Sequence, residues 1–286
     1  MTLLRRLVEQ KLQAAQEWNR KIADLPAFLT AAAREVTALM EAFVARPDLD
    51  ARGKELAQVW KQAVATRGLE PDPDLVVVFG SHRGPNGPST VFCDEGWDTP
   101  LGALRTAVTL ATQVRIDLGL REEPVVPSHP DNAVELHLPF VRYFFPRAEL
   151  LMCGVAASDE AIAIGKRVGE LVLDAKRRAV FVGSTDLTHY GPNYGFEPAG
   201  QGEKAVRWVR EKNDRELIDL VLAQDSAAVV RHGTEKQSAC CPGAVAASLA
   251  AIAAYGGRAT PQLIDHTLSY DVRPDASFVG YAGILL

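Results

Sequence analysis

The chain has 286 residues, of which 47% are hydrophobic and 23% are charged. These proportions are typical of a globular protein and exclude a disordered, collagenous or fibrous chain. The 31 Lys and Arg against 36 Asp and Glu give a formal net charge of −5, which argues against a nucleic-acid-binding protein. No apolar run approaches the roughly 18 residues of a membrane span, and charges interrupt the N-terminal apolar positions, so neither a membrane span nor a signal peptide is predicted. Four cysteines are too few for a disulfide scaffold, and we expect a cytoplasmic protein.

Residues 1–70 are predicted to form a helical segment packed on the rest of the chain. Apolar residues recur every three or four positions in three stretches, which places them on one face of each helix. The segment contains no His and no Cys, so we expect it to contribute no metal ligand. Its expected role is a packing layer or the interface of a homo-oligomer.

From residue 71 onward, strand-like runs alternate with helical ones. Residues 75–80, 150–155 and 179–184 are apolar runs of the kind that form strands buried on both faces. Shorter strands are expected at 89–93, 262–264 and 277–286, and helices at 103–117, 134–145, 158–176, 203–223, 225–232 and 242–254. This alternation predicts an α/β domain over residues 71–286, with a layered, mostly parallel central sheet and helices on both faces.

The residues that could carry chemistry follow the predicted strands, and in open α/β sheets the site lies at the carboxyl ends of the strands. His82 lies in a glycine-rich loop after the first buried strand, although a lone His is often structural. Asp186 and His189, three residues apart after the third, suit an acid/base pair or metal ligation, although Asp186 could equally cap a helix. Cys240 and Cys241 precede a predicted helix, whose N-terminus would lower a thiol pKa. A buried Cys is also commonly just a small hydrophobic residue.

Motifs of several common enzyme classes are absent from the sequence. The segment Gly80-Ser81-His82-Arg83-Gly84 lacks the G-x-S-x-G pattern of a serine hydrolase, and no phosphate-binding P-loop or dinucleotide fingerprint is present. There is also no C-x-x-C pair of a zinc ribbon or a thioredoxin-like centre. Two histidines, an aspartate and a cysteine in loops instead suggest a metal site with nitrogen, oxygen and sulfur ligands.

Four stretches of the sequence resemble the motifs of one known family. They are Gly80-Ser81-His82 followed by Thr99-Pro100-Leu101, the block from Asp131 to Phe140, the loop from Gly183 to Gly191, and Cys240 before a Pro-Gly turn, with Gly280-Tyr281-Ala282-Gly283 resembling the last strand. In this order they resemble the Memo family, also called AmmeMemoRadiSam system protein B. The resemblance covers roughly residues 74–286. It implies a fold similar to the class III extradiol ring-opening dioxygenases.

The resemblance also implies roles for particular residues. In the family, the residues matching His82 and Cys240 are metal ligands, and those matching Asp186 and His189 line the same pocket. His189 would then act as general acid/base with Asp186 beside it. The loop after His82 supplies two expected substrate contacts, Arg83 and Asn86.

One ligand expected from the family is missing here. The family takes another His from an early H-A-G-Y motif, whereas His82 is the first His of this chain. The family's E-H-S has also become Asp131-Asn132-Ala133, and Arg83 stands where some members have a second His. The substitute for the missing ligand is left open among His189, Asp186, His129 and Cys241.

Three functions follow from these residues. The first is a non-haem iron or copper oxygenase or oxidase acting on a small molecule, with zinc ranked below those two metals. The alternative is a non-catalytic, metal-free binding or interaction protein with a degenerate metal site. A third is metal-independent transfer or hydrolysis with Cys240 as nucleophile and His189 as base.

Overall fold

A computed structural model describes residues 72–99, 101–123, 132–257 and 260–286. The helices expected over residues 1–70 lie outside the described residues, as do His129 and Asp131. No helix in the described ranges is long and apolar enough to cross a membrane.

The central sheet has five strands in the order β5-β2-β6-β1-β7. They are β1 Leu75–Arg83, β2 Thr90–Val91, β5 Arg121–Glu122, β6 Glu149–Ala156 and β7 Ala179–Gly183. β6 lies in the centre, and β1 lies between β6 and β7 and pairs in parallel with both. β2 pairs in parallel with β5 but antiparallel with β6, so the sheet is mixed and mostly parallel. The three long strands lie where the apolar runs predicted them.

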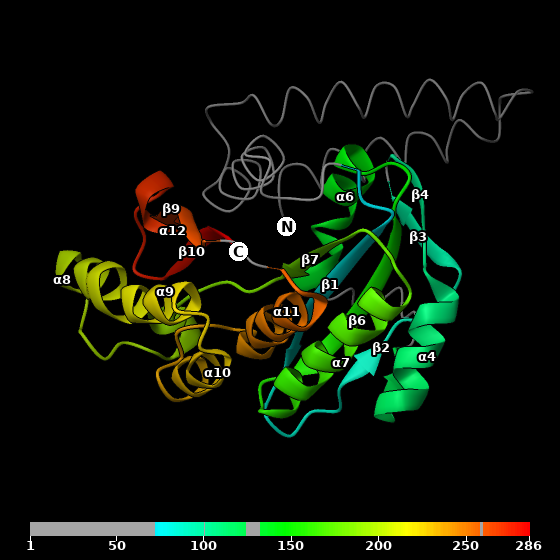
Figure 1. The fold of residues 1–286 in the computed structure, drawn as a ribbon. Helices are drawn as coiled ribbons and strands as arrows, with labels where there is room; N and C mark the ends of the chain where they lie inside the picture. The colour runs from blue at the N-terminus through cyan, green and yellow to red at the C-terminus, as the bar shows by residue number, and fades with distance from the viewer. Residues whose placement is uncertain (1–71, 100, 124–131, 258–259) are drawn as a thin grey trace, which may run out of the picture.

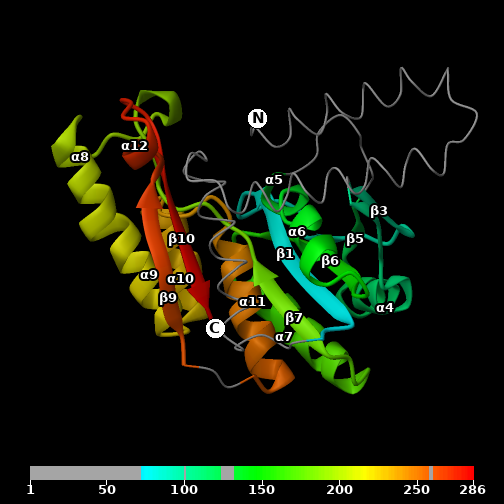
Figure 2. The same ribbon diagram turned by 90° about the horizontal axis from the view of Figure 1, so that it is seen from above.

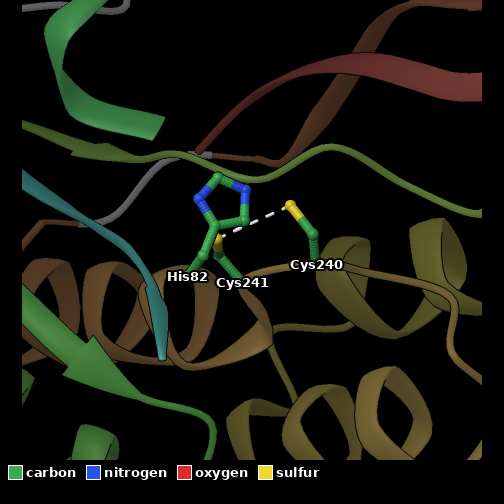
Figure 3. Close-up of side chains that lie close together, drawn as sticks. All are labelled: His82, Cys240 and Cys241. Atoms are coloured by element: carbon green, nitrogen blue, oxygen red, sulfur yellow. Dashed lines mark hydrogen bonds between the residues drawn. The ribbon is translucent and has the colours of Figure 1, made fainter. Parts of the chain in front are cut away.

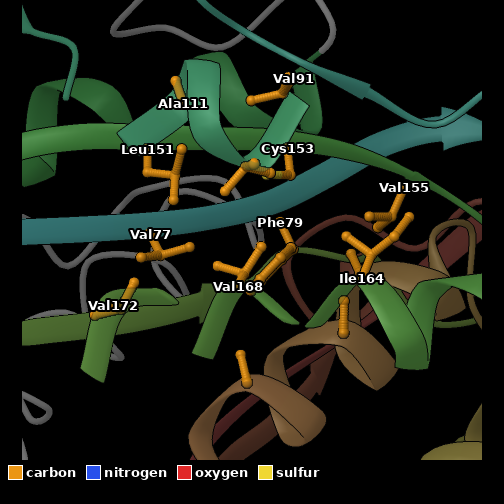
Figure 4. Packing of buried hydrophobic residues seen from close by; sticks show 14 of the residues in the cluster. Val77, Phe79, Val91, Ala111, Leu151, Cys153, Val155, Ile164, Val168 and Val172 are labelled. Carbon is orange, nitrogen blue, oxygen red and sulfur yellow. The ribbon is translucent and has the colours of Figure 1, made fainter. Parts of the chain in front are cut away.

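Helices cover both faces of this sheet, as the layered α/β prediction requires (Figure 1). Leu75, Val77 and Phe79 of β1 face a core under the helices α4, α7 and α11, part of which Figure 4 shows. Val76 and Val78 face the opposite core, under α5 and α6. These helices are α4 Val108–Leu118, α5 Asn132–Glu135, α6 Leu138–Phe144, α7 Glu160–Asp174 and α11 Pro242–Tyr255. Because the strand alternates between two apolar faces, every side chain from 75 to 79 is buried.

Two glycines let α7 and α11 pack at backbone contact. A Cβ on Gly165 would lie 2.1 Å from the carbonyl oxygen of Ala247, and a Cβ on Gly169 would lie 2.3 Å from that of Ala251. Ala247 and Ala251 are themselves fully buried. Small residues on both helices therefore set the position of α11, whose N-terminus follows Cys240 and Cys241.

The C-terminal half adds a second layer beside the central sheet. A three-stranded antiparallel sheet has the order β8-β10-β9, and Figure 2 shows β9 and β10 lying alongside α9 and α10. The elements are α8 Glu203–Trp208, α9 Asp214–Leu222, α10 Ser226–Glu235, α12 Ser269–Val272, β8 His189–Tyr190, β9 Gln262–Leu268 and β10 Phe278–Leu285. Val209–Asn213 form a π-helical turn between α8 and α9. This layer flanks the loop that follows β7.

Two of the predicted helices begin or divide differently in the structure. The helix predicted at 103–117 starts only at Val108, because residues 102–105 form β4, which pairs with β3 Gly96–Thr99 and buries Leu104. Burial and strand pairing override the local helical pattern here. The helix predicted at 134–145 is divided into α5 and α6, and Pro139 lies in the first turn of α6, a position that proline favours.

Candidate metal centre

His82 lies within the carboxyl end of β1, which extends to Arg83, and not in a loop after the strand as the sequence predicted. Gly80 passes so close to α5 that a Cβ there would lie 2.5 Å from Cγ2 of Val134. Ser81 has a φ of 95°, in the region that non-glycine residues rarely adopt. Strained backbone of this kind is often found at functional sites. The side chain of His82 that follows is exposed.

Asp186 and His189 lie in and at the end of the loop that joins β7 to β8. Backbone hydrogen bonds tie this loop to β10: the N–H of Leu187 donates to the oxygen of Gly280 at 2.9 Å, and the N–H of Gly280 donates to the oxygen of Thr188 at 3.0 Å. Held in this way, the loop places Nε2 of His189 3.4 Å from Oδ2 of Asp186. Carboxylate and imidazole are therefore neighbours.

The fully buried carboxylate of Asp214 holds the same loop through hydrogen bonds. Its Oδ1 accepts hydrogen bonds from the N–H of Thr188 at 3.1 Å and from the Thr188 hydroxyl at 2.5 Å. Its Oδ2 lies 3.0 Å from Nε2 of His266, and Asn213 donates to the Thr188 hydroxyl at 2.8 Å. The sequence interpretation missed this network. The available signal was an Asn-Asp pair on the apolar face of a predicted helix, where buried polar groups need partners.

Cys240 is held directly against the Asp186 loop. Its backbone N–H donates to the carbonyl oxygen of Asp186 at 3.1 Å, while the N–H of Asp186 donates to its sulfur at 3.2 Å. The next residue also bonds to the loop, since the N–H of Cys241 donates to the hydroxyl oxygen of Thr185 at 2.9 Å. The segment before α11 and the loop after β7 are thus joined by reciprocal hydrogen bonds.

The pKa of the Cys240 thiol lies well below its ordinary value. The largest cause is its hydrogen bond with the Cys241 thiol, whose sulfur lies 3.5 Å away. A hydrogen bond from His82 and the positive charge of that imidazole also lower this pKa, whereas burial and the negative charge of Asp186 raise it. Cys240 therefore has the thiolate character that metal ligation requires.

The metal-ligating side chains fall into two groups that share Cys240. One group is His82, Cys240 and Cys241, shown in Figure 3, and the other is Asp186, His189 and Cys240. Within each group, the potential ligand atoms lie within 4.8 Å of one another. Among the described residues, neither group combines His82 with Asp186 or His189. The four residues named from sequence are therefore linked through the sulfur of Cys240, which both groups contain.

A pocket of about 370 Å³ opens beside this sulfur. His82, His189 and Cys240 all contribute to its wall. The remaining lining residues are Arg83, Gly84, Pro85, Ala157, Leu187, Tyr194, Gly233, Thr234, Gln237, Ala239 and Pro242. Asp186 reaches the site through its contacts with Cys240 and His189. The volume falls in the range of roughly 300–1,000 Å³ that is typical of small-molecule sites.

The two expected substrate contacts are placed differently. Arg83 lines the pocket, but its guanidinium forms an ion pair with Glu123 at 2.5 Å. The hydroxyl of Thr90 also donates to that carboxylate. Asn86 is exposed in the following turn, outside the residues that line the pocket.

Tyr194 is a pocket residue that the sequence interpretation missed. Its ring centroid lies 4.8 Å from that of His189, and burial, followed by the negative charge of Asp186, raises the pKa of its phenol. It belongs to a short 3₁₀ turn, Pro192–Tyr194, bounded by Gly191 and Gly195. An aromatic residue in a glycine-flanked turn directly after the Asp-His loop was the signal available.

His137, from the block that resembles the family's E-x-[QH]-L-P helix, contacts the opposite side of the loop. Its Nε2 lies 2.9 Å from the hydroxyl oxygen of Ser184. It lies in neither group of potential metal ligands among the described residues. His137 therefore anchors the start of the loop that carries Asp186.

Comparisons with known proteins agree with the motifs. The model of the family described as Memo-like protein matches residues 31–285. A MEMO1 family protein from Methanococcoides burtonii is 31% identical over 220 residues, which cover 76% of this chain and 77% of that protein. Another, from Methanosarcina acetivorans, is 32% identical over 223 residues and 76% of each chain. An uncharacterized protein from Escherichia coli K12 with a solved structure aligns with a TM-score of 0.44 at 14% identity, over 78% of this chain and 90% of that one. On the family model and these relatives, the chain belongs to the Memo-like protein family.

Proposed function

We propose that this pocket binds one transition-metal ion through His82 and Cys240 and acts as an oxidoreductase site for a small molecule. One observation carries the proposal. The sulfur of Cys240 belongs to both groups of potential ligands, and its thiol has a lowered pKa at the wall of a pocket of about 370 Å³.

The residues present fit a transition metal. An imidazole and a thiolate are good ligands for iron, copper and zinc, whereas calcium and magnesium prefer oxygen ligands. Nε2 of His189 is also buried and makes no hydrogen bond in the part of the chain that the structure describes, although Oδ2 of Asp186 lies 3.4 Å from it. A buried polar atom of this kind needs a partner, and a ligand in the pocket would supply one. A bound iron or copper ion would supply one-electron and oxygen chemistry.

Asp186 and His189 would then move protons. His189 lines the pocket, so its imidazole can accept a proton from a substrate hydroxyl or return one. The carboxylate of Asp186, 3.4 Å away, would fix the orientation of the ring. Tyr194 packs against the imidazole and would limit the access of water to it.

The charges around the pocket favour a neutral substrate. Arg83 is the cation nearest to His82 in sequence, and its charge is balanced by Glu123. Asp186 adds a negative charge close to Cys240. An anionic metabolite would therefore meet no unbalanced cation at Arg83, and a small neutral molecule with an ionisable hydroxyl suits the pocket better.

The experiment compares metal content and oxygen consumption. Metal-free protein is loaded with iron or with copper, dialysed, and assayed with a panel of small organic reductants. We expect wild type to retain about one equivalent of metal and to consume oxygen, His189→Ala to retain metal but lose most of the rate, and Cys240→Ser to lose both. Retained metal without oxygen consumption on any substrate would favour the alternative of a non-catalytic binding protein. Absence of retained metal in the wild type would refute the metal site.

A further inference from the structure

Cys241 lies beside the proposed metal site although none of the roles above uses it. Its sulfur is 3.5 Å from that of Cys240, and its side chain is only 2% exposed. Figure 3 shows both cysteine side chains directed to the same region as the imidazole of His82. The three ligand atoms lie within 4.8 Å of one another.

We infer that Cys241 is the third metal ligand and that the ion is held by one imidazole and two thiolates. This inference rests on the proposed function, since it concerns the same ion. Two thiolates on one tetrahedral ion, each about 2.3 Å from it, have sulfur atoms about 3.8 Å apart. The observed separation of 3.5 Å needs to change by only a few tenths of an ångström.

The backbone holds both cysteines in place for this role. The N–H of Asp186 donates to the sulfur of Cys240, and the hydroxyl of Thr185 accepts from the N–H of Cys241. Both cysteines directly precede α11, whose first residue is Pro242 and whose position is set by close packing on α7. The loop thus holds the sulfur of Cys240 and the backbone of Cys241, so metal binding requires little reorganisation.

With His82, Cys240 and Cys241 as ligands, Asp186 and His189 are not needed to bind the metal. Asp186 and His189 belong to the other group around Cys240, and Nε2 of His189 lies 3.4 Å from Oδ2 of Asp186. If Cys241 completes the site, neither of them has to act as a ligand, and both stay available to move protons. The substitute for the missing family His would then be a cysteine next to the shared one.

Two thiolates also change which metal is preferred. Soft thiolate ligands select Cu(I) and Zn(II) over Fe(II) and Mn(II). The set His82, Cys240 and Cys241 therefore favours copper over iron as the redox-active ion. A core role is the competing explanation, because Cys241 also packs in the same buried cluster as Ala244.

The test measures thiolate coordination directly. Reduced, metal-free wild type is titrated anaerobically with Co²⁺ as an optical probe, because sulfur-to-metal charge-transfer absorption rises with the number of bound thiolates. The same titration is made on Cys241→Ala, which keeps an apolar side chain, and on Cys153→Ala, a matched buried cysteine in the same core. Competition with a chelator then gives the Cu(I) and Zn(II) affinities, and urea unfolding verifies that each variant is folded.

We expect Cys241→Ala to lose about half of the charge-transfer absorption. Its Cu(I) and Zn(II) affinities should fall by about 100-fold or more, since removal of a direct ligand should exceed the roughly 10–100-fold effect of outer-shell changes. Cys153→Ala should match the wild type. A folded Cys241→Ala that also matches the wild type would overturn the inference and leave the His82–Cys240 site intact. No charge-transfer absorption in the wild type would instead refute the proposed site as a whole.

Discussion

Cys153 and Cys240 show how two regions of one fold give the same side chain opposite properties. Cys153 lies in the middle of β6, fully buried between neighbouring strands, and burial raises the pKa of its thiol to about 12. Cys240 lies beyond the carboxyl ends of the strands, where hydrogen bonds with Cys241 and His82 keep the pKa of its thiol low. The sheet interior suppresses ionisation, and the loops at its end promote it.

The space around the backbone differs between the α7–α11 contact and the turn that follows His82. In the core, Gly165 and Gly169 are needed because helix backbones touch there. At the sheet end, a Cβ on Gly84 would meet no atom of the described residues within 4 Å. We therefore expect substitutions of the glycines at the α7–α11 contact to change stability, and a substitution at Gly84 to leave it nearly unchanged.

The largest expected effect on stability is at Gly165. Gly165→Ala places a methyl group against the carbonyl oxygen of Ala247, so α7 and α11 must separate. We expect this overpacking to lower the free energy of unfolding by about 3 kcal/mol, which urea denaturation would measure. Gly84→Ala is the control, and its free energy of unfolding should stay within about 0.5 kcal/mol of wild type. Similar losses in the two variants would show that the regions do not differ.

A smaller effect on the free energy of unfolding is expected when the cysteine of each region is replaced by serine. Cys153→Ser buries a hydroxyl among apolar side chains and should cost about 2 kcal/mol of the free energy of unfolding. Cys240→Ser places the hydroxyl beside the N–H of Asp186 and at the pocket wall, so the cost should be below about 1 kcal/mol. Urea unfolding of the metal-free proteins measures both, and an equal cost would contradict the comparison.

The smallest effect is a dependence of stability on pH that comes from Cys240. Because its pKa is lower in the folded than in the unfolded chain, its ionisation stabilises the folded protein increasingly as pH rises from the folded pKa toward the ordinary value of 9.0. The difference in free energy of unfolding between metal-free wild type and Cys240→Ser should therefore grow with pH in this window and be independent of pH below it. A difference that is constant with pH would mean that the pKa of the Cys240 thiol is not lowered in the folded protein.

Alkylation measures the ionisation of each cysteine thiol separately. Iodoacetamide reacts with the thiolate, so in metal-free protein it should label Cys240 at a pH where Cys153 stays unmodified. Peptide mass spectrometry over a pH series distinguishes the two. Simultaneous labelling of both residues would indicate that the protein unfolds rather than that Cys240 is activated.

The sequence predicted the scaffold better than the arrangement of the site. Apolar runs are local signals, and they located β1, β6 and β7 because strands buried on both faces need continuous hydrophobic residues. The ends of predicted strands also located His82, Asp186 and His189, and the start of a predicted helix located Cys240. Both histidines were expected in loops, but β1 extends to Arg83 and β8 begins at His189. The division of these residues around one sulfur depends on the packing of α11 on α7 and on the hydrogen bonds between Cys240 and Asp186, which join residues 54 apart in sequence.

The buried hydrogen bonds that hold the site in place could not be predicted from the sequence either. Asp214 holds Thr188 from a helix more than twenty residues downstream, and a Cβ on Gly280 would lie 2.0 Å from its carboxylate. The β3–β4 hairpin also depends on distant contacts, since Leu104 joins the core cluster of Val76 and Phe92. In both cases the partner is fixed only once the chain has folded.

X-ray absorption at the metal edge tests most directly whether the sulfur of Cys240 holds the metal. Copper- or zinc-loaded wild type should show sulfur neighbours at about 2.3 Å together with nitrogen at about 2.0 Å. Cys240→Ser should lose sulfur amplitude relative to the wild type under the same loading. A wild-type spectrum with only nitrogen and oxygen neighbours, or an unchanged sulfur shell in Cys240→Ser, would contradict a metal site built on Cys240.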